Sequence, residues 1–143
     1  MPGKKKLLKR GSARLIDVRT FTDRRGSLSV VEADVDLPFV PRRLYYLYGT
    51  AQGVSRGAHA HLAQMQCMIA ISGSVDLTID DGKQRRTFQL ARPNLGLLVR
   101  PVVWREIYNI SADAVLVVLA SDNFSEADYI RDYDAFMTLM NEI

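Results

Sequence analysis

The feature that most constrains the fold is a series of short apolar segments, each ended by turn residues, that runs from Arg14 to Ala120. Within residues 74–82, apolar and polar side chains alternate strictly from Val75 to Asp80, ahead of an Asp81-Gly82 turn. Alternation with a period of two is typical of a half-buried strand. The predicted strands fall within residues 14–21, 27–33, 42–49, 64–73, 74–82, 85–90, 95–101, 105–110 and 114–120. Because no ten-residue helical pattern separates them, the sequence predicts an all-β sandwich or barrel.

Only the C-terminal end has a different spacing of apolar residues. Between residues 125 and 143 the apolar side chains recur at helical intervals, and Ser125-Glu126 supplies a plausible cap. The sequence therefore predicts a short C-terminal helix and a single domain over residues 14–143, without repeats or linkers.

The charge of the chain is concentrated at its start. The formal net charge is +3, yet the first ten residues hold five of the 19 lysines and arginines, so residues 1–13 are expected to be a solvated, poorly ordered tail without a nucleic-acid function. The apolar stretch of a signal peptide is missing there, and the longest apolar run, residues 114–120, is too short to span a bilayer. With one cysteine, Cys67, expected as a buried inert thiol, we expect a cytoplasmic protein that binds neither membrane nor nucleic acid.

Both histidines of the chain, His59 and His61, lie one residue apart, so on a strand their side chains share a face. Gln66 follows five residues after His61, and Gly73 seven after Gln66. This spacing resembles the first motif of the cupins, small double-stranded β-barrels of the jelly-roll type. Residues 94–109 resemble the second motif, and the resemblance implies that Arg105 stands where the third histidine ligand of a metal-binding cupin stands.

The departures from the cupin pattern concern the metal ligands. Gln66 replaces the glutamate ligand, and Arg105 replaces the third histidine. A neutral amide is a poor ligand, and a guanidinium has no lone pair to donate and repels a divalent cation. We therefore expect no metal and no cofactor.

Without a metal, two imidazoles beside arginine and tyrosine form a proton-transfer site. Imidazole has an unperturbed pKa near 6.5, and a nearby Arg105 disfavours the imidazolium, which leaves a neutral base. The chemistry that fits is removal of a proton beside a carbonyl group.

Four longer stretches carry a closer resemblance: RRLYYLYGTAQGVSRGAHAH (42–61), AISGSVDLTIDDG (70–82), LLVRPVVWREIYN (97–109) and VLASDNFSEADYIRDYDAF (118–136). They are similar to the sugar 3,4-ketoisomerases of the WxcM-like cupin group. The resemblance implies a homodimeric, metal-independent enzyme that moves the keto group of dTDP-4-keto-6-deoxyglucose from C4 to C3. Its product would supply an aminotransferase that makes a 3-amino-3,6-dideoxyhexose for a surface polysaccharide or a glycosylated metabolite.

For this reaction we assign the carbon proton to His61 and the oxygen shuttle to His59, with the reverse assignment left open. Tyr48 shares a strand face with Tyr46; if that face looks into the barrel, Tyr48 could donate to the enediolate oxygen, and Tyr46 could contact the substrate.

Further substrate contacts are expected from cationic and planar side chains. Arg25, Arg56 and Arg105 are candidates for the diphosphate and the sugar. Arg25 and Arg105 flank positions that are expected to face C4, although the gluco or galacto configuration of the product stays open. Trp104 either stacks on substrate or fills the core, and Gln66 could fix a histidine tautomer.

Two alternatives from other classes remain at this stage. A metal-dependent cupin epimerase or dioxygenase would be favoured by a bound metal, or by a distinct carboxylate dyad that partners a histidine, and the sequence offers no such ligand set. A non-catalytic nucleotide-sugar-binding module would bind dTDP and exchange no proton.

Overall fold

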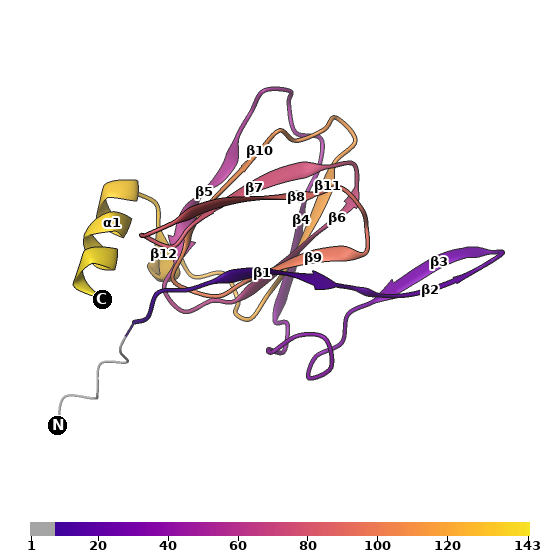
Figure 1. The fold of residues 1–143 in the computed structure, drawn as a ribbon, viewed down its shortest axis with the longest axis horizontal. Helices are drawn as coiled ribbons and strands as arrows, with labels where there is room; N and C mark the ends of the chain where they lie inside the picture. The colour runs from indigo at the N-terminus through magenta and orange to yellow at the C-terminus, as the bar shows by residue number, and fades with distance from the viewer. Residues whose placement is uncertain (1–7) are drawn as a thin grey trace.

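The computed structural model describes residues 8–143, which form two facing five-stranded sheets, a two-stranded arm and a C-terminal helix (Figure 1). The first sheet has the order β1-β9-β6-β11-β4, the second β12-β5-β10-β7-β8, and β2 pairs with β3 alone. Their bounds are β1 (Ala13–Asp17), β2 (Arg19–Asp23), β3 (Gly26–Val30), β4 (Arg43–Leu47), β5 (Arg56–His61), β6 (Gln66–Ser72), β7 (Val75–Asp80), β8 (Arg85–Leu90), β9 (Leu95–Val99), β10 (Trp104–Tyr108), β11 (Val115–Ala120) and β12 (Tyr129–Ile130). A 3-10 turn, η1 (Glu126–Asp128), precedes β12, and α1 (Tyr133–Glu142) ends the chain.

The main core lies between the two sheets. Leu97 and Leu116 from the first sheet pack with Leu77 and Leu90 from the second, and all four side chains are buried. Their alternation with outward-facing residues is what a two-layer β fold requires. The predicted all-β class is confirmed, with the strands divided between two facing sheets and not closed into one hydrogen-bonded ladder.

The first predicted strand, residues 14–21, is divided between β1, which belongs to the first sheet, and β2, which belongs to the arm. Val18, between β1 and β2, is buried against Leu37 and Phe39. Beyond it, β2 and β3 form a hairpin that projects away from the barrel (Figure 1). Phe21 and Leu28, which pair across the hairpin, are each 62% exposed. The arm therefore presents an apolar pair that the described residues leave exposed.

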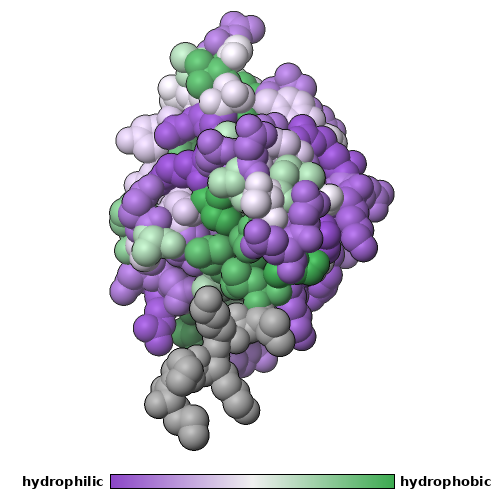
Figure 2. Space-filling model, turned by 90° about the vertical axis from the view of Figure 1, so that its left-hand side faces the viewer, coloured by the Kyte–Doolittle hydropathy of each residue, from purple (hydrophilic) through white to green (hydrophobic). Residues whose placement is uncertain are grey.

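The helix α1 covers the outer face of the second sheet. Phe136 and Met140 are fully buried against Ala60 and Trp104. Figure 2 shows this end of the molecule, where apolar side chains gather in the middle of a hydrophilic face. Because α1 packs on Ala60 and Trp104, these residues lie on the outward faces of β5 and β10, and the opposite faces line the interior.

The C-terminal helix begins later than the sequence predicts. It starts at Tyr133 with the Asp132 carboxylate accepting a hydrogen bond from Ala135 N, and Ser125 caps no α-helix. Tyr129 and Ile130 are instead a short strand that pairs with His61 and Ala60. The exposed edge of β5 offers unpaired backbone groups, and pairing with them overrides the helical periodicity of this segment.

Part of the expected N-terminal tail belongs to the barrel. Residues 1–7 lie outside the described residues, but Gly11 N donates to Val102 O, and Val102 N donates to Lys9 O. The Arg10 guanidinium donates to backbone oxygens of Asp81 and Met140. The expected boundary at residue 13 is therefore too late. Within residues 8–143, no helix is long and apolar enough to cross a membrane.

Candidate active site

A cavity of about 340 Å³ opens between the edge strand β4 of the first sheet and β5 with β12 of the second. Its walls carry four arginines, two tyrosines, one histidine and four apolar or small residues. They are Arg43, Tyr45, Leu47, Arg56, Gly57, His59, Met68, Arg105, Ile107, Tyr129 and Arg131.

Strand register brings the polar residues of this cavity together. Within the second sheet, His59 pairs with Arg105 of β10, and His61 pairs with Tyr129 of β12. Cross-strand partners point to the same face, so all four side chains are directed inward, while Ala60 between the histidines faces α1. The prediction that His59 and His61 share a strand face is confirmed.

A bend at the start of β5 shapes the cavity wall. Gly57 has φ of 70°, and a side chain on it would come within 3.1 Å of Ile107 Cδ1. Glycine tolerates both conditions, and the pairing of β5 with β10 shifts register at this point.

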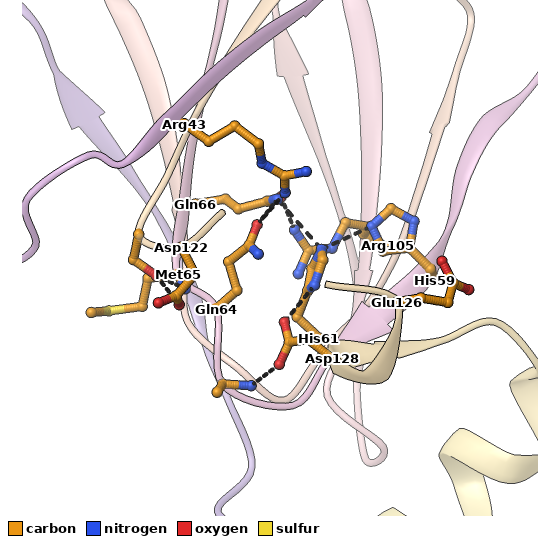
Figure 3. A network of polar contacts seen from close by, with 12 residues as sticks. Arg43, His59, His61, Gln64, Met65, Gln66, Arg105, Asp122, Glu126 and Asp128 are labelled. Carbon is orange, nitrogen blue, oxygen red and sulfur yellow. Dashed lines mark hydrogen bonds and ion pairs between the residues drawn. The ribbon is translucent and has the colours of Figure 1, made fainter. Parts of the chain in front are cut away.

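The two histidines form a hydrogen-bonded chain that ends on a carboxylate (Figure 3). Nε2 of His59 lies 3.1 Å from Nε2 of His61, and Nδ1 of His61 lies 2.9 Å from Oδ2 of Asp128. The other carboxylate oxygen of Asp128 accepts from Ala63 N at 2.8 Å. The Tyr129 ring packs on both imidazoles, with centroid distances of 4.9 Å to His59 and 4.4 Å to His61. Both rings are therefore held in place.

Burial keeps the two imidazoles neutral. It is the largest cause that lowers the pKa of His59 to about 3 and that of His61 to about 2, and the Arg105 guanidinium is the next. The contact between His61 and Asp128 is thus a hydrogen bond from a neutral ring and not an ion pair. His61 is completely buried, whereas His59 lines the cavity.

Arg105 is a buried cation without a carboxylate partner among residues 8–143. It is 1% exposed, and burial lowers its pKa to about 10, which still leaves it charged. One guanidinium nitrogen donates to Gln66 Oε1, while Nε and the second terminal nitrogen have no hydrogen-bond partner within the described part of the chain. Since an uncompensated buried charge is costly, this arrangement favours an anionic group in the cavity.

Amide and guanidinium groups continue the network behind Arg105 (Figure 3). Gln66 Nε2 lies 2.7 Å from Gln64 Oε1 and 3.4 Å from Nε2 of His61. Arg43 donates to the same Gln64 oxygen at 2.8 Å. This places Gln66 between Arg105 and His61, as a residue that fixes a histidine tautomer would be.

The donor set does not fit a metal ion. Nδ1 of His61 is taken by Asp128, the two Nε2 atoms bond to each other, and Arg105 occupies the amide oxygen of Gln66. Over residues 8–143, no group of three or more His, Cys, Asp or Glu side chains is arranged to hold a metal.

The tyrosines in and directly after β4 face opposite to the expectation. Tyr46 and Tyr48 are 56% and 67% exposed on the outer face, and the structure does not bring either to the histidines. Tyr45 instead lines the cavity, with its hydroxyl 3.3 Å from Gln66 Nε2. Alternation correctly separated Tyr45 from the other two, but the strand alone does not say which face is inward.

Three other residues that were expected to contact the substrate lie in three different parts of the molecule. Arg56 lines the cavity. Trp104 packs under α1 on the opposite face of β10 and donates to Glu106 at 3.3 Å, so it fills the core and is not part of the cavity lining. Arg25 lies at the tip of the projecting arm, 85% exposed and paired with Asp23, away from the cavity of its own chain (Figure 1).

Asp128 is the functional residue that the sequence analysis missed. Its carboxylate reaches His61 across 67 positions of sequence, a contact that the sequence analysis did not identify. It lies inside the stretch 118–136, but the helical periodicity of that segment hid its position. A carboxylate that orients an imidazole can assist any general-base step, so it does not by itself distinguish an isomerase from an epimerase.

The fold and the site together define a cupin-like β protein whose interior cavity is lined by an imidazole and arginines and adjoins Gln66. Residues 11–141 match the model of the family FdtA, described as WxcM-like, C-terminal, and the chain belongs to this family.

Individual relatives agree with this assignment. The chain is 38% identical over 130 residues to the TDP-4-oxo-6-deoxy-alpha-D-glucose-3,4-oxoisomerase of Aneurinibacillus thermoaerophilus, covering 91% of this chain and 94% of the relative. It superposes with a TM-score of 0.88 and 40% identity on a 3,4-ketoisomerase from Helicobacter canadensis, covering 90% and 97% of the two chains. A 3,4-ketoisomerase from Thermoanaerobacterium thermosaccharolyticum, 32% identical with a TM-score of 0.88 over 91% and 94% of the chains, was solved as a histidine-to-asparagine variant in complex with TDP-4-keto-6-deoxyglucose.

Proposed function

We propose that this protein is a TDP-sugar 3,4-ketoisomerase that converts dTDP-4-keto-6-deoxyglucose into the 3-keto isomer. The observation that carries the proposal is that neutral imidazoles adjoin a buried Arg105 that has no carboxylate partner among residues 8–143, at one cavity. Proton removal beside a ketone needs a neutral base and a fixed positive group for the enediolate oxygen, and the cavity holds both.

His59 is the better candidate for the carbon proton. It lines the cavity, whereas His61 lies behind it and has both ring nitrogens engaged. The geometry thus favours the reverse of our first assignment. Arg105 and the Tyr45 hydroxyl, which replaces Tyr48 in this role, would stabilise the enediolate oxygen.

The diphosphate is proposed to bind at the arginines around the cavity. Arg43, Arg56 and Arg131 all line it, and Arg131 is now paired with Glu126 at 2.6 Å. Guanidinium forks match phosphate oxygens in bidentate geometry, so these three side chains would hold the charged part of the substrate while the sugar reaches His59.

The reaction is proposed to be metal-independent and to need no cofactor. The ring nitrogens and the amide oxygen that a cupin metal would use are already bonded to protein groups. This is the point on which the proposal differs from a metal-dependent cupin epimerase or dioxygenase.

We propose a homodimer that the arm helps to form. A two-stranded hairpin is marginally stable in water by itself, yet β2 and β3 project from the barrel with Phe21 and Leu28 exposed. The outer face of β4 exposes Leu44 and Tyr46. A second copy that covers such apolar surface would stabilise the arm, and Arg25 would contact substrate only through such a partner.

We place the enzyme in the cytoplasm, in agreement with its single buried cysteine, Cys67, whose thiol has its pKa raised to about 12 by burial. Its 3-keto product has the functional group that an aminotransferase needs to install a 3-amino group, as in polysaccharide precursors.

Solvent-deuterium incorporation tests the function. The protein is incubated with dTDP-4-keto-6-deoxyglucose in D₂O, and the sugar is followed by NMR. We expect the carbonyl to move from C4 to C3 with deuterium delivered to C4, and the coupling pattern then gives the C4 configuration. Exchange with the carbonyl still at C4 would indicate an epimerase, and binding of dTDP without exchange a non-catalytic module. The variant His59→Asn should bind dTDP and exchange nothing.

A further inference from the structure

The line of hydrogen bonds from Asp128 through His61 to His59 has a defined direction. A carboxylate only accepts, so Nδ1 of His61 must donate to Oδ2 of Asp128 across 2.9 Å. Burial keeps His61 neutral, with its pKa lowered to about 2, so its Nε2 carries no hydrogen and accepts. The 3.1 Å contact between the Nε2 atoms then requires Nε2 of His59 to be the donor.

This direction decides which atom of His59 can act as a base. His59 is also neutral, with its pKa lowered to about 3, and therefore has one N–H group. If that hydrogen is on Nε2, the lone pair is on Nδ1. Within residues 8–143, Nδ1 is the one ring nitrogen of the pair that has no hydrogen-bond partner, and His59 lines the cavity.

We propose that Asp128 is a positioning residue, whose carboxylate orders the hydrogens along His61 and His59 so that Nδ1 of His59 presents its lone pair to the substrate. The identity of the transferred proton rests on the proposed function. Asp128 itself does not touch the substrate; it acts through two rings and sets the tautomer of the second.

The proton step balances without any further reactant. The C3–H bond breaks, and its proton binds Nδ1 of His59. The electron pair forms the C3=C4 bond, and the carbonyl pair moves to the C4 oxygen, beside Arg105. The hydroxyl proton on the C3 oxygen then passes to the C4 oxygen. The proton on His59 exchanges with solvent, and His59 then delivers a solvent-derived proton to C4 as the C3 carbonyl forms.

The substitution Asp128→Asn would reverse the direction of the hydrogen bonds that run through His61 and His59. Asparagine has a single side-chain oxygen, and Ala63 N already donates to that side of Asp128 at 2.8 Å. If the amide oxygen keeps this bond, the amide NH₂ faces Nδ1 of His61, which must then accept. Nε2 of His61 becomes the donor, Nε2 of His59 the acceptor, and the hydrogen of His59 moves to Nδ1. The base is then blocked although every heavy atom keeps its place.

The tautomers can be read directly, because the chain has only two histidines. In tag-free protein labelled with ¹⁵N-histidine, long-range ¹H–¹⁵N spectra distinguish a protonated from an unprotonated ring nitrogen. In the wild type we expect His61 to be protonated on Nδ1 and His59 on Nε2, and in Asp128→Asn we expect both to be reversed. This measurement needs no substrate, so it does not depend on the activity.

Kinetics give the second test. We expect Asp128→Asn to lower kcat by about 10³- to 10⁴-fold, as the wrong tautomer does in other imidazole–carboxylate sites, with KM changed less than about threefold. Asp132→Asn is the matched control, because Asp132 caps α1 four residues away and should leave kcat unchanged. In Asp128→Ala, added formate should restore part of kcat, whereas formamide should not.

The outcomes separate this proposal from the proposed function. A wild-type spectrum with His61 protonated on Nε2 would overturn the ordering whatever the enzyme does, and so would an Asp128→Asn variant with wild-type kcat. A wild type that orders its tautomers as expected but moves no carbonyl would refute the ketoisomerase reaction and leave the ordering intact. If Asp128→Asn fails to fold, the wild-type spectrum and the formate rescue still decide.

Discussion

The cavity and the β2–β3 arm carry the same residue type, arginine, in opposite surroundings. Arg105 is 1% exposed and has no carboxylate partner among the described residues, whereas Arg25 is 85% exposed and paired with Asp23 at 2.6 Å. Water and the carboxylate satisfy Arg25, so nothing in its own chain requires a ligand there. In the protein interior, one guanidinium nitrogen of Arg105 has a hydrogen-bond acceptor, Gln66, and the other two have none among the described residues. Both were expected to contact substrate, and burial distinguishes the two.

Among the changes that test this comparison, Arg105→Met should have the largest effect. We expect kcat/KM to fall by about 10²- to 10³-fold, because a fixed donor to the enediolate oxygen is lost. The melting temperature should stay within about 4 °C of the wild type or rise, since removal of a desolvated cation offsets the lost bond to Gln66. Activity assays and calorimetry on one preparation check both.

Arg85→Met is the matched control for this experiment. Arg85 lies on the outer face of the second sheet, with Asp80 and Glu106 as carboxylate partners. Its replacement should lower the melting temperature slightly and leave kcat/KM unchanged. A large loss of stability in Arg105→Met with normal kinetics would show that the buried cation serves the fold and not the substrate.

A substitution in the arm should change the oligomeric state of the protein more than it changes the catalysed step. We expect Phe21→Asp to convert the proposed dimer to a monomer in analytical ultracentrifugation, because a charge would replace half of the apolar pair that Phe21 forms with Leu28. Thr22→Asp adds the same charge to the face of the arm that carries the Thr22–Ser27 hydrogen bond and should stay dimeric. A wild type that sediments as a monomer would contradict the proposed role of the arm.

Arg25→Ala should have a smaller effect. An exposed cation that meets a substrate through a partner is worth about 1 kcal/mol, so we expect KM to rise roughly 3- to 10-fold with kcat nearly unchanged. Arg24→Ala, one residue earlier on the same tip, is the control. Kinetic constants equal to those of the wild type would remove Arg25 from the substrate contacts.

The smallest effect is expected from mild acid. Because burial and Arg105 lower the pKa values of His59 and His61 to about 3 and 2, kcat/KM should stay flat from pH 8 to 5. An inflection near pH 6.5 would contradict the neutral pair.

The same pKa values predict how stability depends on pH. Unfolded imidazoles bind protons near pH 6.5, while the folded ones do so only near pH 3 and 2. The unfolded state therefore binds more protons in this window, and the free energy of unfolding should fall as the pH drops below about 6.5, with no such penalty above it. Urea titrations at pH 7.5 and 5 measure the difference.

Much of the cavity could be predicted from local pattern alone. The period of two placed His59 and His61 on one face, and the spacing to Gln66 and Arg105 fitted a barrel motif whose metal ligands are missing. These inferences succeed because strand periodicity and side-chain chemistry depend on near neighbours. The same pattern separated Tyr45 from Tyr46 and Tyr48 but did not indicate which side was inward.

The assignments that failed depend on long-range contacts. Trp104 was a candidate for stacking because it adjoins Arg105, but adjacent residues on a strand face opposite ways, and α1 covers its side. Asp128 looked helical until the exposed edge of β5 drew Tyr129 and Ile130 into a strand, which placed the carboxylate beside His61.

The sequence by itself determined the residue types of the chemistry: a strand with two imidazoles, an amide and a guanidinium where metal ligands would be, and strands enough for a barrel. Only the tertiary structure decided which tyrosine is inward, which histidine meets the cavity, and that a carboxylate stands behind the pair. The reason is physical. The direction of a side chain along a strand follows from its own backbone, whereas burial and hydrogen-bond partners depend on which distant strand or loop packs against it.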